Sequence, residues 1–134
     1  MTRLLDTNVC VRLLNGTSPP LTARASSHHP SDLLISSVTV AELVYGAHRS
    51  ARKAENLRLL SRFLSPFALL PFDDECAERS GMVRAYLAER GTPIGPHDLL
   101  IGATALEHDL ILVTHNTREF RRVPGLSLED WEEP

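Results

Sequence analysis

Short apolar runs alternate with helical patterns along this chain, and this alternation limits the fold more than any other feature. The runs expected to form strands cover residues 3–6, 33–36, 67–71, 111–114 and, at an edge, 126–128. Helical patterns separate them over about 7–14, 21–27, 38–48, 54–64, 76–91 and 99–107. The run from Gly16 to Pro20 is expected to break the chain. The alternation predicts an α/β fold in which helices cover both faces of a parallel sheet.

Length and composition predict one cytoplasmic domain. A chain of 134 residues suits a single domain, residues 1–134, and 43% hydrophobic with 23% charged residues is typical of a packed globular core. No apolar run reaches the roughly 18 residues of a membrane span, and the N-terminus has no signal-peptide pattern. Cys10 and Cys76 lack metal-ligand spacing and are expected to be buried thiols.

Charge is unevenly distributed, although the net charge is only −3. That balance argues against a protein that coats nucleic acid by charge alone. Residues 49–62 are strongly basic, with Glu55 as their one acid. The basic residues here are either a solvated helix face or a rim that contacts phosphates, and the candidates for RNA contact are Arg49, Arg52, Lys53 and Arg58.

Three carboxylates stand where apolar segments begin or end. Asp6 closes the first strand candidate, Glu42 follows the second, and Asp98 precedes the apolar stretch 99–106. Parallel strands share a carboxyl edge where ligands gather, and Asp6 and the loop after Thr114 fall there. The hypothesis is that the fold brings the three acids together. Their mutual repulsion in low-dielectric surroundings then needs a cation, and carboxylates are the hard ligands that Mg²⁺ or Mn²⁺ prefer. The leading hypothesis is a metal-dependent phosphoryl-transfer or hydrolysis site.

Each carboxylate also has a purely structural interpretation. Asp6 suits a turn in which it accepts backbone amides. Glu42 completes a capping box with Thr39. Asp98 complements the dipole of a helix that starts near Pro96. No single acid is specific, so the metal-site hypothesis depends on their joint placement.

The polar run after the fourth strand candidate, residues 114–120, extends the hypothesis. Asn116 and Glu119 lie three apart and can offer two further oxygen ligands from one turn. Thr7, Asn8 and Thr114 are candidates to orient ligands or waters around them. The alternative is an ordinary strand-to-helix turn. The histidines show no spacing typical of a zinc protease, and the chain has no phosphate-cradling glycine loop.

Four blocks of this sequence resemble the signature blocks of PIN-domain ribonucleases, and more narrowly those of VapC-type toxins. The blocks, which occur in the family's order, are LLDTN at 4–8, ISSVTVAELVYGA at 35–47, IGPHDLLI at 94–101 and VTHNTREF at 113–120. The resemblance implies a three-layer α/β/α sandwich with a central, mostly parallel sheet. It also implies Mg²⁺-dependent endonucleolytic cleavage of RNA, often tRNA, with Mn²⁺ as a possible substitute.

The resemblance further implies a small cognate VapB-like antitoxin and a homodimer. The family's acidic quartet carries over onto Asp6, Glu42 and Asp98, which would hold the metal. At the fourth position Asn116 stands where many relatives have aspartate, and Glu119 is the nearby acid. Arg118 is the RNA-contact candidate nearest the site.

Two rival functions belong to other classes. A catalytically silent PIN-like module that binds RNA or protein is disfavoured by the complete set of acids. A phosphoaspartate receiver needs paired acids after its first strand and a lysine late in the chain. Lys53 is the only lysine here, so the receiver interpretation fails.

Overall fold

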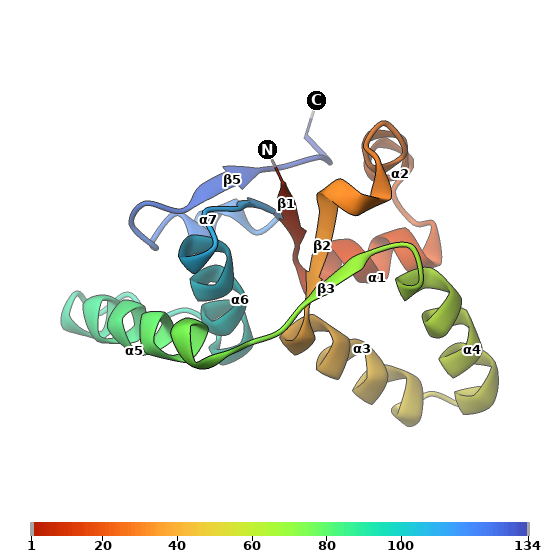
Figure 1. Ribbon diagram of the computed structural model, residues 1–134, viewed down its shortest axis with the longest axis horizontal. Helices are drawn as coiled ribbons and strands as arrows, with labels where there is room; N and C mark the ends of the chain where they lie inside the picture. The colour runs from red at the N-terminus through yellow and green to blue at the C-terminus, as the bar shows by residue number, and fades with distance from the viewer. Residues whose placement is uncertain (1, 134) are drawn as a thin grey trace.

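A five-stranded parallel sheet forms the centre of the protein, whose computed structural model describes residues 2–133 (Figure 1). Its strand order is β3-β2-β1-β4-β5, and each neighbouring pair is parallel. The strands are β1 (Arg3–Leu5), β2 (Leu33–Ser36), β3 (Ala68–Leu70), β4 (Ile111–Val113) and β5 (Ser127–Glu129). The pairing confirms the predicted parallel sheet, with β5 as its edge strand.

Helices cover both faces of the sheet and complete the predicted three-layer α/β/α sandwich. They are α1 (Thr7–Asn15), α2 (Pro19–Ser26), α3 (Ser37–Arg49), α4 (Lys53–Leu64), α5 (Asp74–Glu89), α6 (Pro96–Glu107) and α7 (Thr117–Phe120). A 3₁₀ turn, Pro30–Asp32, precedes β2. Figure 1 shows α3 and α4 on one side of the sheet, and α6 on the other with α5 outside it.

Alternating side chains of the strands supply the two halves of the core. Leu5 and Ile35 pack on one face with residues of α1 to α4. Leu4 and Leu112 pack on the other face with α6 and α7. This is the two-residue period of a strand, and each buried leucine contributes about 1.5–3 kcal/mol to folding relative to an exposed one. Both faces are therefore apolar, as a parallel sheet requires.

The predicted break between the first two helices is too long. The break expected at residues 16–20 is shorter, because α2 begins at Pro19. Proline is well suited to the first position of a helix, where its missing amide leaves no hydrogen bond unmade. Gly16 ends α1 in the left-handed region, at φ 65°, which is why the chain turns there. Within residues 2–133, no helix combines the length and apolarity needed to cross a membrane.

Candidate active site

The carboxyl edge of the sheet collects the candidate residues. All five strands are parallel, so the residues that follow β1, β2 and β4 lie along one edge. The register pairs Leu5 with both Ile35 and Val113, which places Asp6 beside the ends of β2 and β4. Helix α6 runs back across the sheet before β4 begins, so its first turn also lies at this edge. Segments that are distant in sequence thus meet at one place.

Asp6 is held rigidly at the centre of this edge. Its side chain is buried and caps α1, where Oδ1 accepts the amide of Val9 at 2.8 Å. Oδ2 accepts the hydroxyl of Thr114 at 2.5 Å. Burial raises the pKa of Asp6, while the bonds from Thr114 and Val9 and the charge of Arg12 lower it. Asp6 has the turn role that the sequence suggested. The same hydrogen bonds fix its carboxylate in the site, so the structural role and a role in the site are compatible.

Glu42 does not form the capping box that the sequence suggested. Helix α3 begins earlier, and its N-cap is Ser36, whose hydroxyl accepts the amide of Val38 at 3.1 Å. Glu42 therefore lies inside the helix, where its carboxylate accepts the hydroxyl of Thr7 at 2.6 Å and contacts Nδ1 of His97 at 3.0 Å. Both partners come from other elements of the site, so the carboxylate is directed into it.

Asp98 lies half-buried in the first turn of α6. Its pKa is raised to about 6, first by burial and then by the negative charges of Asp6, Glu119 and Glu42. His97 lowers it in part. The helix-dipole role expected for Asp98 does not hold its pKa down, because burial and then the neighbouring acids raise it. Asp98 is thus close enough to three other carboxylates to be affected by the charge of each.

The run after β4 contributes through α7. Nδ2 of Asn116 donates to Oε2 of Glu119 at 2.6 Å, and the amide of Asn116 donates to the hydroxyl of Thr114 at 3.0 Å. Asn116 is the N-cap of α7 without a side-chain cap bond. The structure therefore contains the strand-to-helix turn, and it also brings the Glu119 charge to Asp98.

The donor set fits a hard divalent cation. The carboxylates of Asp6, Glu42 and Glu119 each act on Asp98 through their charge, and the basic groups that face these acids are His97 and Arg12. Arg12 interacts electrostatically with Asp6, yet it is also ion-paired with Glu132 at 2.8 Å. An excess of acids at a partly buried edge is the arrangement that Mg²⁺ or Mn²⁺ offsets.

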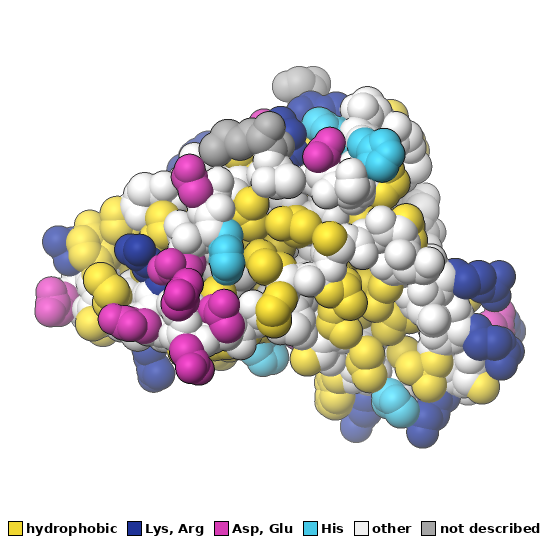
Figure 2. All heavy atoms as spheres, viewed as in Figure 1, with side chains coloured by type: hydrophobic (Ala, Val, Ile, Leu, Met, Phe, Trp, Pro, Cys, Tyr) yellow, Lys and Arg dark blue, Asp and Glu magenta, His cyan; other side chains and the backbone are white. Residues whose placement is uncertain are grey.

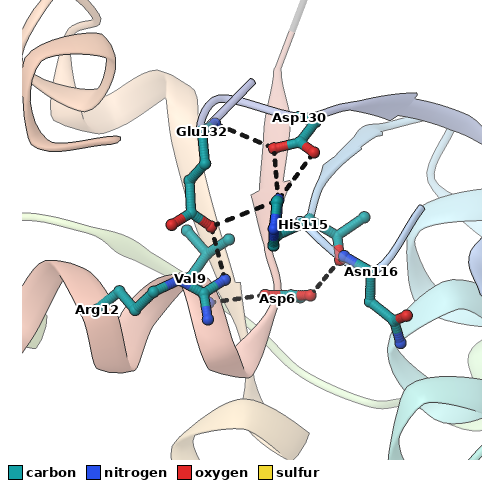
Figure 3. Close-up of polar contacts among 8 residues, drawn as sticks. Asp6, Val9, Arg12, His115, Asn116, Asp130 and Glu132 are labelled. Carbon is teal, nitrogen blue, oxygen red and sulfur yellow. Dashed lines mark hydrogen bonds and ion pairs between the residues drawn. The ribbon is translucent and has the colours of Figure 1, made fainter. Parts of the chain in front are cut away.

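The C-terminal segment is a part of this region that the sequence did not reveal. Figure 3 shows Glu132 reaching Arg12, and Asp130 reaching His115, beside Asp6. Nδ1 of His115 lies 2.9 Å from Asp130 Oδ2. The charge of Glu132 raises the pKa of Asp6. The acidic tail was visible in the sequence only as a contribution to net charge.

Other candidate residues lie outside this cluster. Asn8 is exposed in the first turn of α1 and Arg118 is exposed on α7. Figure 2 shows Lys and Arg side chains gathered over α4 and the α3–α4 turn, where the exposed residues Arg49, Arg52, Lys53 and Arg58 belong. Arg49 follows Glu42 by about 10 Å along α3. The basic stretch is therefore a surface separate from the acidic site, although α3 connects the two.

A groove of about 440 Å³ begins at the acidic site and runs between α1, α3 and α4. Thr7 and Glu42 line one part of it, and Val11, Leu14 and Leu59 line apolar parts. Leu59 is 42% exposed, while Leu60, its neighbour on α4, is buried in the core. The groove thus joins exposed apolar surface to carboxylates.

The raised pKa of Asp98 predicts how stability depends on pH without metal. Between its ordinary value of 3.8 and about 6, the native state binds more protons than the unfolded state, so the free energy of unfolding falls as pH rises through this window. Because Asp98 is half exposed, solvent screening limits the loss to about 1 kcal/mol. Thermal unfolding in a chelator from pH 4.5 to 8 measures this loss of stability. If stability fell no more steeply with pH in the natural chain than in Asp98→Asn, the prediction would be contradicted.

The fold and site together define an α/β protein with an acidic edge, and comparisons place it in a family. The PIN domain model matches residues 3–126. The tRNA(fMet)-specific endonuclease VapC of Salmonella typhimurium is 39% identical over 96% of each chain. Ribonuclease VapC2 of Rickettsia felis is 36% identical over 98% of this chain and 99% of that one.

Solved structures agree with these relatives. DNA-bound VapBC from Salmonella typhimurium matches with a TM-score of 0.92 and 38% identity over 98% of each chain. VapBC2 from Rickettsia felis, bound to a promoter DNA fragment, matches with a TM-score of 0.89 and 34% identity over 96% of this chain and 98% of that one. The chain belongs to the PIN domain family, in its VapC branch, which confirms the resemblance seen in the sequence.

Proposed function

We propose that this chain is an Mg²⁺-dependent endoribonuclease toxin that cleaves tRNA and is neutralised by a VapB-like antitoxin. The observation that carries the proposal is the position of Asp98 at the carboxyl edge of the sheet, where the charges of Asp6, Glu119 and Glu42 all act on it. The relatives named as VapC ribonucleases support the reaction class. The PIN model, which spans most of the chain, supports a single domain over residues 1–134.

Asp6, Asp98 and Glu42 would hold the cation, with Glu119 and Asn116 completing its surroundings. A bound Mg²⁺ or Mn²⁺ supplies Lewis-acid chemistry: it acidifies water and offsets charge on the phosphate. Asp6 contributes a preorganised charge, because both its oxygens are already fixed by Val9 and Thr114. A carboxylate beside the reacting water accepts its proton. The hydroxyl of Thr7 donates to the carboxylate of Glu42 and so fixes its position in the site.

RNA reaches an acidic site through surrounding positive charge. Arg118 lies on α7 beside the site, and the basic stretch of α4 extends from its other side. The phosphate backbone of RNA on either side of the cleaved bond is therefore expected to contact Arg118 and the residues Arg49, Arg52, Lys53 and Arg58. The proposal of tRNA as substrate draws on the relative named as a tRNA(fMet)-specific endonuclease.

The direct test is cleavage by the purified chain. Incubation with total tRNA and Mg²⁺ is expected to give discrete fragments, and sequencing the fragment ends locates the cut. A chelator should stop the reaction, and Mg²⁺ or Mn²⁺ should restore it, because the cation offsets the repulsion among the acids. Tight Mg²⁺ binding without cleavage of any RNA would instead favour a catalytically silent PIN-like binding module.

Glu42→Gln separates a structural role from a role in the site. Glutamine keeps the size of the side chain and its bond with Thr7, so the melting temperature should change little. The lost charge should lower cleavage steeply at limiting Mg²⁺, by on the order of 10²-fold, and less at high Mg²⁺. Cleavage rates across an Mg²⁺ titration measure this, and full activity at every concentration would remove Glu42 from the site.

The groove beside Glu42 is the surface we assign to the antitoxin. Its apolar lining suits the apolar face of a partner helix, and its acidic end suits an arginine of the partner, since guanidinium groups pair bidentately with carboxylates. Leu60 lines the groove but is buried in the core, whereas Tyr45, next to the lining residue Gly46 on α3, is 65% exposed. Solved VapBC complexes support a partner of this kind. The resemblance also supports a homodimer.

A further inference from the structure

A second cluster of metal-type ligands lies away from the acidic site. Asp73, Cys76 and His108 place a carboxylate oxygen, a thiol sulfur and an imidazole nitrogen all within 4.8 Å of one another. Asp73 is the N-cap of α5, Cys76 is in its first turn, and His108 is the C-cap of α6. The separation of these residues along the chain hid the cluster from sequence analysis.

The geometry of the cluster suits a tetrahedral ion. Sγ of Cys76 lies 3.6 Å from Nε2 of His108. A zinc ion with about 2.3 Å to sulfur and about 2.0–2.1 Å to nitrogen, at a tetrahedral angle, separates these two atoms by roughly 3.6 Å. The two side chains are thus already spaced as ligands of one ion. The third ligand is preset as well, because Oδ1 of Asp73 accepts the amide of Cys76 at 2.9 Å.

The surroundings allow an ion to enter and favour its binding. Cys76 is buried, but His108 is half-buried and Asp73 is exposed, so the cluster opens to solvent on the Asp73 side. Bonds from Cys76 lower the pKa of Asp73, which keeps its carboxylate charged. Burial raises the pKa of the Cys76 thiol, so an entering ion must displace its proton and bind more tightly at higher pH.

We propose that Asp73, Cys76 and His108 form a binding site for Zn²⁺, with water as the fourth ligand. A thiolate and an imidazole select a borderline-soft ion, whereas the all-oxygen acidic site selects Mg²⁺ or Mn²⁺. The two sites are therefore chemically distinct. They also lie at opposite ends of α6, because His108 follows Asp98 by about 15 Å along the helix. An ion here joins the start of α5 to the end of α6 and stabilises their packing.

Cobalt substitution tests the site, because Co²⁺ bound by a thiolate gives a charge-transfer absorption in the near ultraviolet. Titrating the reduced full chain with Co²⁺ should produce this band, and Zn²⁺ should abolish it by competition. Cys76→Ser should remove the band. His108→Gln and Asp73→Asn should each weaken Co²⁺ affinity about tenfold or more. Asp73→Asn is a mild change for the fold, since asparagine is also a good N-cap.

Matched controls make the result specific. Cys10 is the other free cysteine, fully buried in the core among apolar residues, so Cys10→Ser should leave the band unchanged. His115→Asn should also leave it, because the cluster of His115, Asp130 and Glu133 contains no sulfur. Zn²⁺ should raise the melting temperature of the natural chain and not that of His108→Gln, with RNA cleavage equal in both.

Three results would overturn the proposal. The first is the absence of a charge-transfer band in the natural chain, and the second is a band that depends on Cys10 instead of Cys76. If Cys76→Ser fails to fold, His108→Gln decides, because its side chain is half-buried at a helix end and its loss is tolerated more easily. The third is therefore undiminished Co²⁺ affinity in His108→Gln.

Discussion

Asp98→Asn is expected to abolish RNA cleavage while the protein stays folded. The amide keeps the shape of the side chain but removes a charge that lies among Asp6, Glu42 and Glu119. Cleavage should fall by on the order of 10²–10³-fold or more. Without the Asp98 charge, the cation that would offset the negative charge on the phosphate in the transition state is held less well. Without metal, the free energy of unfolding near neutral pH should rise by about 1 kcal/mol as carboxylate repulsion is relieved. Rates with excess tRNA and melting curves in a chelator measure the two effects.

Asp74→Asn is the matched control for this change. Asp74 is an exposed acid in the first turn of α5, as Asp98 is in that of α6, so the same substitution there changes charge away from the site. Cleavage should be unaffected and stability should fall slightly through the helix dipole. If purified Asp98→Asn cleaves as fast as Asp74→Asn, the acidic edge is not the catalytic site.

Leu59→Asp is expected to release the chain from its antitoxin without reducing cleavage. Leu59 lines the groove next to the acidic site and is 42% exposed, so aspartate there is solvated in the free protein. In the complex, the charge would be buried against an apolar partner surface. Loss of a central apolar contact typically costs about 2 kcal/mol or more, a weakening of about 30-fold or more. Binding measured by calorimetry, and cleavage at fixed antitoxin concentration, test this.

Met82→Asp serves as the comparison for the groove. Met82 is 59% exposed on α5, across the molecule from α4. Its replacement therefore exchanges an exposed apolar side chain for the same charge, but outside the groove. Antitoxin affinity should then stay within a few-fold of that of the natural chain. Equal affinities of Leu59→Asp and Met82→Asp would place the antitoxin elsewhere.

Local patterns predicted most of the fold. The apolar run 33–36 became β2 with the bounds expected, and the fully apolar pattern after Asp98 became the buried helix α6. Such patterns are readable because a strand buried on both faces and a helix buried on most sides need continuous apolar side chains. The start of α3 was less readable, since Ser36 and Thr39 are both good caps and only packing decides between them.

The sequence by itself determined the α/β class, the family and the set of acids, because strand and helix periods and the four ordered blocks are properties of neighbouring residues. Tertiary structure decided which side chains meet. It turned Glu42 toward Thr7 and His97, brought Glu119 to Asp98, and set His108 beside Cys76. These pairs are far apart along the chain, and their distances follow from strand order and helix packing, which no local pattern encodes.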